Sequence, residues 1–226
     1  MCPDDGLVQT QPAREYEDNE VSGHPTFFAI LAKGGLVMIP LVASSILVLA
    51  VVLERWLFWQ RFRTQEDGER ILALVSAGLL PQALEMAHAS RHPVAQVLGA
   101  GLKHRDAMPS MAMEAASQAE LHRLKRYLPL LDTIITLAPL LGLLGTITGM
   151  ISAFGLVSAS GLGQPHAITG GVAEALIATA TGLTIAILTL VPYNYFRAKV
   201  EAITRLMEER ATRLELLFHS LPKWER

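Results

Sequence analysis

The uncharged stretch of residues 133–173 reads TIITLAPLLGLLGTITGMISAFGLVSASGLGQPHAITGGVA. Its 41 residues include no Asp, Glu, Lys or Arg. A helix needs only about 20 residues to cross the hydrocarbon core of a bilayer. The segment Ser158–Pro165 divides the stretch and is rich in Gly and Ser, which is typical of turns. The stretch therefore predicts two membrane-spanning helices joined by a short loop.

Two further uncharged runs extend this pattern. Residues 34–53 lie between Lys33 and Glu54, and residues 175–196 follow Glu174. The whole chain is 51% hydrophobic and only 18% charged, whereas soluble domains carry about a quarter charged residues. We therefore predict an all-α integral membrane protein with three transmembrane helices, at about 34–57, 129–157 and 168–196.

The distribution of Lys and Arg predicts the orientation of the chain. Two precede the first span, none lies between the second and third, ten lie within 55–126 and seven within 197–226. Because cytoplasmic loops carry the excess of positive charge, we expect a multi-pass protein of the inner (plasma) membrane. Its N-terminus should be periplasmic and its C-terminus cytoplasmic.

These boundaries predict a domain organisation along the chain. The expected parts are a disordered periplasmic tail (1–30), a first transmembrane helix (31–58), a helical cytoplasmic domain (59–128), a second transmembrane helix (129–157), a short periplasmic loop (158–167), a third transmembrane helix (168–196) and a cytoplasmic helical extension (197–226). The tail is acidic and polar, which is typical of disorder.

The cytoplasmic part is expected to be helical. We predict helices at Glu69–Val75, Pro81–His88 and about Pro93–Lys103. A fourth begins near Ser110 and has no helix breaker before Pro129. We therefore expect the second transmembrane helix to extend into the cytoplasm without interruption. The third should extend there as well, because apolar residues recur at helical spacing after Phe196.

Small residues form stripes on the second and third spans. Gly142, Gly145 and Gly149 share one face of the second span, because steps of three and four residues return to the same side of a helix. Ala178 and Gly182 form a similar stripe on the third. Such spacing lets helices approach closely in lipid, so we predict helix packing at these five residues.

Polar residues within the same spans suggest a second role. Thr146 lies in the glycine stripe, and its hydroxyl could either bond to its own backbone or face a hydrated path. Glu174 lies near the start of the third span. A carboxylate there marks a bundle interior or a cavity, unless it reaches water at the outer interface. Threonine cannot exchange protons at ordinary pH, so a proton path here would need an acid from another chain.

The sequence gives no indication of an enzyme. It contains no nucleophile–base pair and no phosphate-binding loop, and its seven histidines are scattered. A single cysteine, Cys2, excludes an internal disulfide, and no metal-ligand spacing occurs. The net charge of −2 gives no reason to propose a nucleic-acid partner. We expect no cofactor and no bound metal.

Three stretches resemble the ExbB/TolQ/MotA proton-channel family. Residues 138–146 (APLLGLLGT) resemble its second-span signature, and 173–183 (AEALIATATGL) resemble the third. Gly34-Gly35, Pro40-Leu41 and Glu54-Arg55 are similar to its first span. The resemblance implies a homopentamer around a single-span ExbD/TolR-like partner whose membrane aspartate carries the proton. It also implies that Thr146, Thr179 and Glu174 line the pathway, to which we add Thr181.

The resemblance favours one branch of this family. MotA-type flagellar stator subunits have four spans, whereas three are predicted here, so the ExbB/TolQ branch fits better. That branch implies transfer of work to a TonB/TolA-like transducer, in nutrient import or in envelope maintenance. The alternatives are a MotA-like subunit and a non-conducting membrane scaffold in which the small residues serve packing alone.

Overall fold

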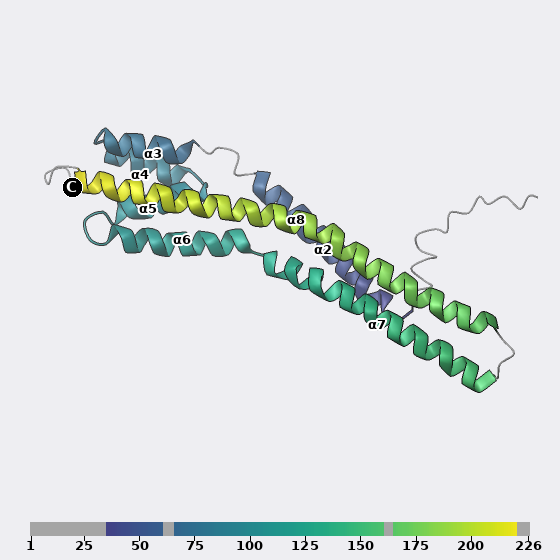
Figure 1. The fold of residues 1–226 in the computed structure, drawn as a ribbon. Coiled ribbons are helices and arrows are strands. Elements are labelled where there is room, and N and C mark those ends of the chain that lie inside the picture. Colours follow the sequence, from purple (N-terminus) through teal and green to yellow (C-terminus); the bar gives the residue numbers. More distant parts are fainter. Residues whose placement is uncertain (1–34, 61–65, 161–164, 221–226) are drawn as a thin grey trace, which may run out of the picture.

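The computed structural model describes residues 35–60, 66–160 and 165–220, which form helices joined by short loops (Figure 1). The predicted tail 1–30 and part of the predicted loop 158–167 lie outside the described residues. In chain order the helices are α2 (Met38–Gln60), α3 (Asp67–Ser76), α4 (Leu80–Ala89), α5 (Pro93–Lys103), α6 (Pro109–Lys125), α7 (Leu128–Ser160) and α8 (Pro165–Ser220).

Among the described residues, three helical segments are long and apolar enough to cross a membrane. They are α2, the segment Pro109–Gly155, which covers α6 and most of α7, and Thr169–His219 within α8. The predicted fold class, an all-helical membrane protein whose last two spans are long, is confirmed. At 1.5 Å per residue, the 56 residues of α8 extend about 84 Å. Because the bilayer core is only about 30 Å thick, α8 must project far beyond the membrane.

The helices α7 and α8 form an antiparallel hairpin along most of their common length (Figure 1). α2 packs across this hairpin through a small cluster in which Met38 and Leu41 meet Ile134, Ala138 and Ala178. Each of these side chains is at most 4% exposed. The three spans therefore form one packed unit within a single chain.

The second span does not continue from the preceding helix without a break. α6 ends at Lys125, Tyr127 has a positive φ of 67°, and α7 begins at Leu128. The expectation of an uninterrupted helix from Ser110 is therefore corrected at Arg126–Tyr127. The reason is Pro129, whose ring would clash with the carbonyl four residues earlier inside a helix but fits well in a first turn.

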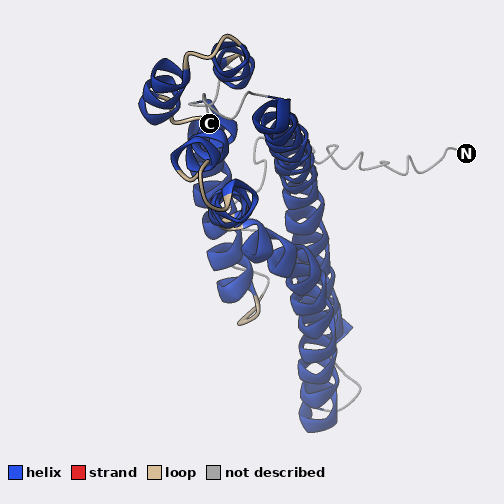
Figure 2. Cartoon of the chain, turned by 90° about the vertical axis from the view of Figure 1, so that its left-hand side faces the viewer, coloured by secondary structure: helices blue, strands red, loops and turns tan. Residues whose placement is uncertain are grey.

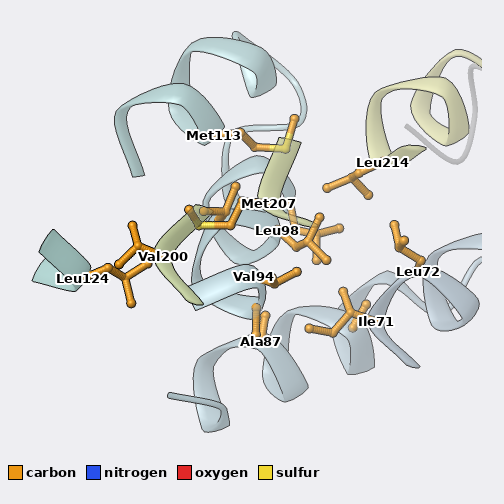
Figure 3. Packing of buried hydrophobic residues seen from close by; sticks show 14 of the residues in the cluster. Ile71, Leu72, Ala87, Val94, Leu98, Met113, Leu124, Val200, Met207 and Leu214 are labelled. Atoms are coloured by element: carbon orange, nitrogen blue, oxygen red, sulfur yellow. The ribbon is translucent and has the colours of Figure 1, made fainter. Parts of the chain in front are cut away.

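The short helices α3–α6 pack around the C-terminal part of α8, at one end of the long helices (Figure 2). We call this unit the α3–α6 bundle. Its core is apolar, and α8 contributes Val200, Met207 and Leu214, which are seven residues apart (Figure 3). A seven-residue spacing keeps these side chains on one helix face. α8 therefore joins the membrane hairpin to the bundle as one continuous rod.

Arg55 fixes the end of α2 to the junction between α6 and α7. It is 1% exposed, its Nη2 donates to Glu54 Oε1 at 2.8 Å, and its Nη1 donates to the Arg123 carbonyl at 3.4 Å. The guanidinium lies over the rings of Phe58, at 4.4 Å, and Tyr127, at 5.4 Å. Such a planar group can be hydrogen-bonded and stacked at once, which a lysine cannot reproduce.

We predict that Arg55→Lys lowers the free energy of unfolding by about 1.5–3 kcal/mol, the size of a lost charged hydrogen bond. SDS-driven unfolding in mixed micelles measures this change. Arg197→Lys is the control, because Arg197 forms an exposed pair with Glu201, and such pairs contribute little. Equal effects of the two substitutions would contradict the proposal that Arg55 fixes the end of α2 to the α6–α7 junction.

His92 caps the start of α5 in its neutral form. Its Nδ1 accepts a hydrogen bond from the Val94 N–H at 3.3 Å, and the side chain is buried. Burial lowers the pKa of His92 below its ordinary value of 6.5, and the nearby Asp67 only partly opposes this shift. Below pH 6.5 the unfolded chain therefore binds a proton that the folded chain does not.

The α3–α6 bundle should accordingly lose stability as the pH falls below about 6.5, by at most about 1.4 kcal/mol per pH unit. The stability is fully present above that value. Hydrogen exchange of the α5 amides, corrected for intrinsic rates, follows the opening of the bundle. His92→Asn keeps an N-cap side chain without the titration and should flatten the profile. An unchanged profile in His92→Asn, or a flattened one in the exposed His88→Asn, would refute the assignment.

Candidate functional site

The three glycines of the second span all face α8 of the same chain. A Cβ on Gly142 would lie 3.0 Å from the Thr179 Cα, and one on Gly149 would lie 3.0 Å from the Ala175 Cβ. A Cβ on Gly145 would lie 2.5 Å from the Ala178 Cβ. We call Gly142, Gly145 and Gly149 the glycine face. It lets the backbones of α7 and α8 approach more closely than any side chain would permit.

The stripe on α8 completes this contact. Ala178 is fully buried, and a Cβ on Gly182 would collide with the Ala138 carbonyl oxygen. Gly171 extends the contact, since its Cβ would lie 2.7 Å from that of Ala153. Gly171 and Ala175 are four residues apart and share a helix face, which is the spacing of small residues expected for a packed surface of this span.

Thr179 lies inside the hairpin, at its closest part. Its hydroxyl donates to the Gly142 carbonyl across the helix pair at 3.0 Å, and the Ala175 carbonyl of its own helix lies 3.3 Å away. The side chain is half-buried. An interhelical hydrogen bond of this kind adds modest stability within a membrane. Thr179 therefore has a structural role that the sequence did not reveal.

Thr146 lies on a different surface of α7. Its hydroxyl donates to the Leu143 carbonyl at 2.6 Å. It borders an open hollow of about 530 Å³ whose other lining residues are Ile147, Met150, Ile151 and Phe154. Ile151 and Phe154 are 67% and 57% exposed. All the lining residues belong to one helix, so the chain by itself supplies one wall of this site.

Thr181 and Glu174 lie at two further places. The Thr181 hydroxyl donates to the Ile177 carbonyl at 2.8 Å, within its own helix. Glu174 is half-buried, and its carboxylate lies against Gly35, just before α2. The structure therefore does not gather Thr146, Thr179, Thr181 and Glu174 around one cavity of the described chain. Their assignment to a proton pathway stays a prediction.

The described residues contain no cluster of three His, Cys, Asp or Glu side chains that could hold a metal ion.

The sequence did not indicate a particular role for Thr189. Thr189 is completely buried in α8, and its hydroxyl donates to the Ile185 carbonyl at 2.6 Å. Such a bond satisfies the hydroxyl within its own helix. Nothing in its sequence position separates it from Thr181 or Thr184.

Comparison with known proteins gives concordant results. Residues 89–209 match the MotA/TolQ/ExbB proton channel family. The chain is similar to the putative biopolymer transport protein ExbB-like 3 of Synechocystis sp., with 35% identity over 200 residues that cover 84% of this chain and 95% of the relative. ExbB-like 1 of the same organism is 40% identical over 201 residues, covering 84% and 78% of the two chains. The Tol-Pal system protein TolQ of Pseudomonas aeruginosa is 26% identical over 222 residues, covering 88% and 95%.

The fold and these matches define a multi-pass α-helical membrane protein built on a glycine-packed hairpin. The chain belongs to the MotA/TolQ/ExbB proton channel family. The resemblance found in the two span signatures is thereby confirmed, and so is the prediction that the chain is not an enzyme, because this is a family of channels.

Gly182→Ala should destabilise the hairpin by about 1–3 kcal/mol, the usual cost of overpacking. The reason is that the added Cβ meets the backbone oxygen of Ala138, which cannot rotate away. Gly155→Ala is the matched control, since nothing lies within 4 Å of its Cβ. SDS-driven unfolding in mixed micelles should show a loss for the first variant only. An unchanged free energy of unfolding in Gly182→Ala would contradict the close approach of α7 and α8.

Proposed function

We propose that this chain is the channel-forming subunit of an inner-membrane proton-driven motor of the ExbB/TolQ branch. In it a homopentamer surrounds an ExbD/TolR-like single-span partner. The motor would couple the proton motive force to outer-membrane import or envelope maintenance through a TonB/TolA-like transducer. Family membership and the names of its relatives support this role. The three candidate spans found within residues 35–60, 66–160 and 165–220 favour this branch over four-span stator subunits.

The observation that carries the proposal is the open wall around Thr146. Ile147, Met150, Ile151 and Phe154 are each at least 37% exposed within the single chain. This wall has one hydroxyl among apolar side chains. Such a surface suits the flank of an apolar helix, with a polar point at which water or an acid can be held. A partner helix would supply the missing walls.

The distribution of acids supports the need for that partner. Within residues 133–196, Glu174 is the only Asp, Glu, Lys or Arg. A proton cannot cross the apolar core on threonine hydroxyls, which do not titrate at ordinary pH. An acid on a second chain, placed beside Thr146, would complete the path.

The positive charges at 55–126 and 197–226 favour a cytoplasmic α3–α6 bundle and a periplasmic α7–α8 connection.

A non-conducting scaffold remains the second candidate, and a specific observation favours it. The glycine face and Thr179 are both used in packing within one chain. Thr146 and Thr181 bond to their own helices. Proton uptake by dye-loaded liposomes separates the two candidates. A channel subunit should give potential-driven uptake when reconstituted with an ExbD/TolR-like single-span protein, and a scaffold should give none.

Thr146→Ala and Thr179→Ala should each reduce this proton uptake by about tenfold or more, while the assembled complex still forms. Loss of one hydrogen bond to the water or acid in a proton path, about 1–1.5 kcal/mol, corresponds to about a tenfold slower transfer. Thr212→Ala is the control, because Thr212 is exposed on α8 and bonds to the Glu208 carbonyl of the same helix. Size-exclusion chromatography reports assembly. Normal uptake in both Thr146→Ala and Thr179→Ala would reject the assigned roles.

A further inference from the structure

Gly35 and Glu174 lie in contact although they are far apart in the sequence. Gly35 precedes α2 and has a φ of +70°, in the left-handed region that favours glycine. A Cβ built on Gly35 would overlap the Glu174 carboxylate at Oε1 and would lie 3.0 Å from its Cδ. The carboxylate therefore occupies the space that any other residue at position 35 would fill.

The first turn of α2 fixes the place of this contact. The Met38 N–H donates to the Gly35 carbonyl at 3.1 Å, and the Ile39 N–H donates to the Leu36 carbonyl at 3.3 Å. These bonds place Gly35 directly at the helix start. Glu174 therefore touches the chain at the point where α2 begins.

The start of α2 is held in place independently of Glu174. Met38 is 4% exposed and packs in the cluster that contains Ala178. Val37 faces the crossing of the hairpin, with its Cβ 3.7 Å from the position of a Cβ on Gly145. The apolar contacts thus present a fixed backbone to the carboxylate, so the geometry does not depend on the charge.

We propose that Gly35 is a positioning residue for Glu174, which it holds against the first turn of α2. The left-handed backbone and the missing side chain of Gly35 create the space for the carboxylate. The inference rests on the proposed function, in which Glu174 belongs to the proton pathway. It deepens that proposal, because the orientation of Glu174, the only Asp, Glu, Lys or Arg in residues 133–196, is then set by the start of the first span.

The contact is tested by carbodiimide labelling of the full chain in lipid nanodiscs, with dicyclohexylcarbodiimide as the probe and mass spectrometry of the Glu174 peptide as the readout. This reagent modifies accessible protonated carboxyls in apolar surroundings. Gly35→Ala should speed labelling of Glu174 by about tenfold, because the added Cβ displaces the carboxylate from its cover at Gly35. An unchanged rate would overturn the inference.

Gly78→Ala is the matched control. Gly78 also has a positive φ, of +76°, but nothing lies within 4 Å of its Cβ position. Both substitutions therefore introduce the same left-handed backbone strain, and only the one at Gly35 meets the carboxylate. Faster labelling of Glu174 in Gly78→Ala would also overturn the inference, since strain alone would then explain the effect.

A rescue variant separates a positioning role from a merely structural one. Glu174→Asp shortens the acid by one methylene and leaves room for a Cβ at position 35. Proton uptake should fall in Gly35→Ala relative to the unmodified chain. By contrast, Gly35→Ala/Glu174→Asp should show the same uptake as Glu174→Asp alone. If Gly35→Ala does not assemble, assembly of the double variant gives the same support. Equal failure of the single and double variants would contradict the inference.

Glu174→Gln distinguishes failure of this inference from failure of the proposed function. It removes the titrating group and keeps the size of the side chain. Full proton uptake by Glu174→Gln would reject the role of Glu174 in the pathway. Loss of uptake in Glu174→Gln, together with normal uptake and labelling in Gly35→Ala, would reject the positioning role alone.

Discussion

The close approach of α7 and α8 is the contact on which the rest of the structure depends. At Gly142 and Gly182 the two backbones meet with no side chain between them. In lipid, where the surroundings are as apolar as the helices, association relies on such close packing and on interhelical hydrogen bonds. The bond from Thr179 to the Gly142 carbonyl adds the second element. Every other part of the chain is placed relative to this hairpin.

α2 is attached to the hairpin unit at both of its ends, by different interactions. At its start, Met38 packs into the small apolar cluster and Gly35 meets Glu174. At its other end, the buried guanidinium of Arg55 contacts the α6–α7 junction near Tyr127. α2 is therefore held against the rest of the chain at both of its ends.

These contacts divide the polar residues of the spans into two groups. Thr179 and Glu174 are engaged within the chain, in the hairpin and against α2. Thr146 instead lies on an open, mostly apolar wall contributed by α7 alone. The residues that the sequence assigned to one proton pathway thus lie on different surfaces. In the proposed function, the first group would fix the shape of the channel subunit and the second would meet the partner.

The sequence by itself determined the membrane class, the number of spans and the residue types at the helix contact. The reason is that uncharged length and small-residue spacing are local properties, set by bilayer thickness and helical periodicity. It also located the helices α3–α5, with each predicted end at most two residues from the observed one. It did not reveal the break at Tyr127, because Pro129 alone does not distinguish the first turn of a new helix from a kink in a continuous one.

Only the tertiary structure decided which partner each side chain meets. The glycine stripe fitted a contact with another chain as well as it fitted α8, and the distances show the latter. Glu174 and Gly35 are separated by most of the chain, and nothing in the sequence around Arg55 indicates that its guanidinium is buried. Contacts between distant segments depend on how the helices pack against one another, and periodicity within a single helix carries no record of that arrangement.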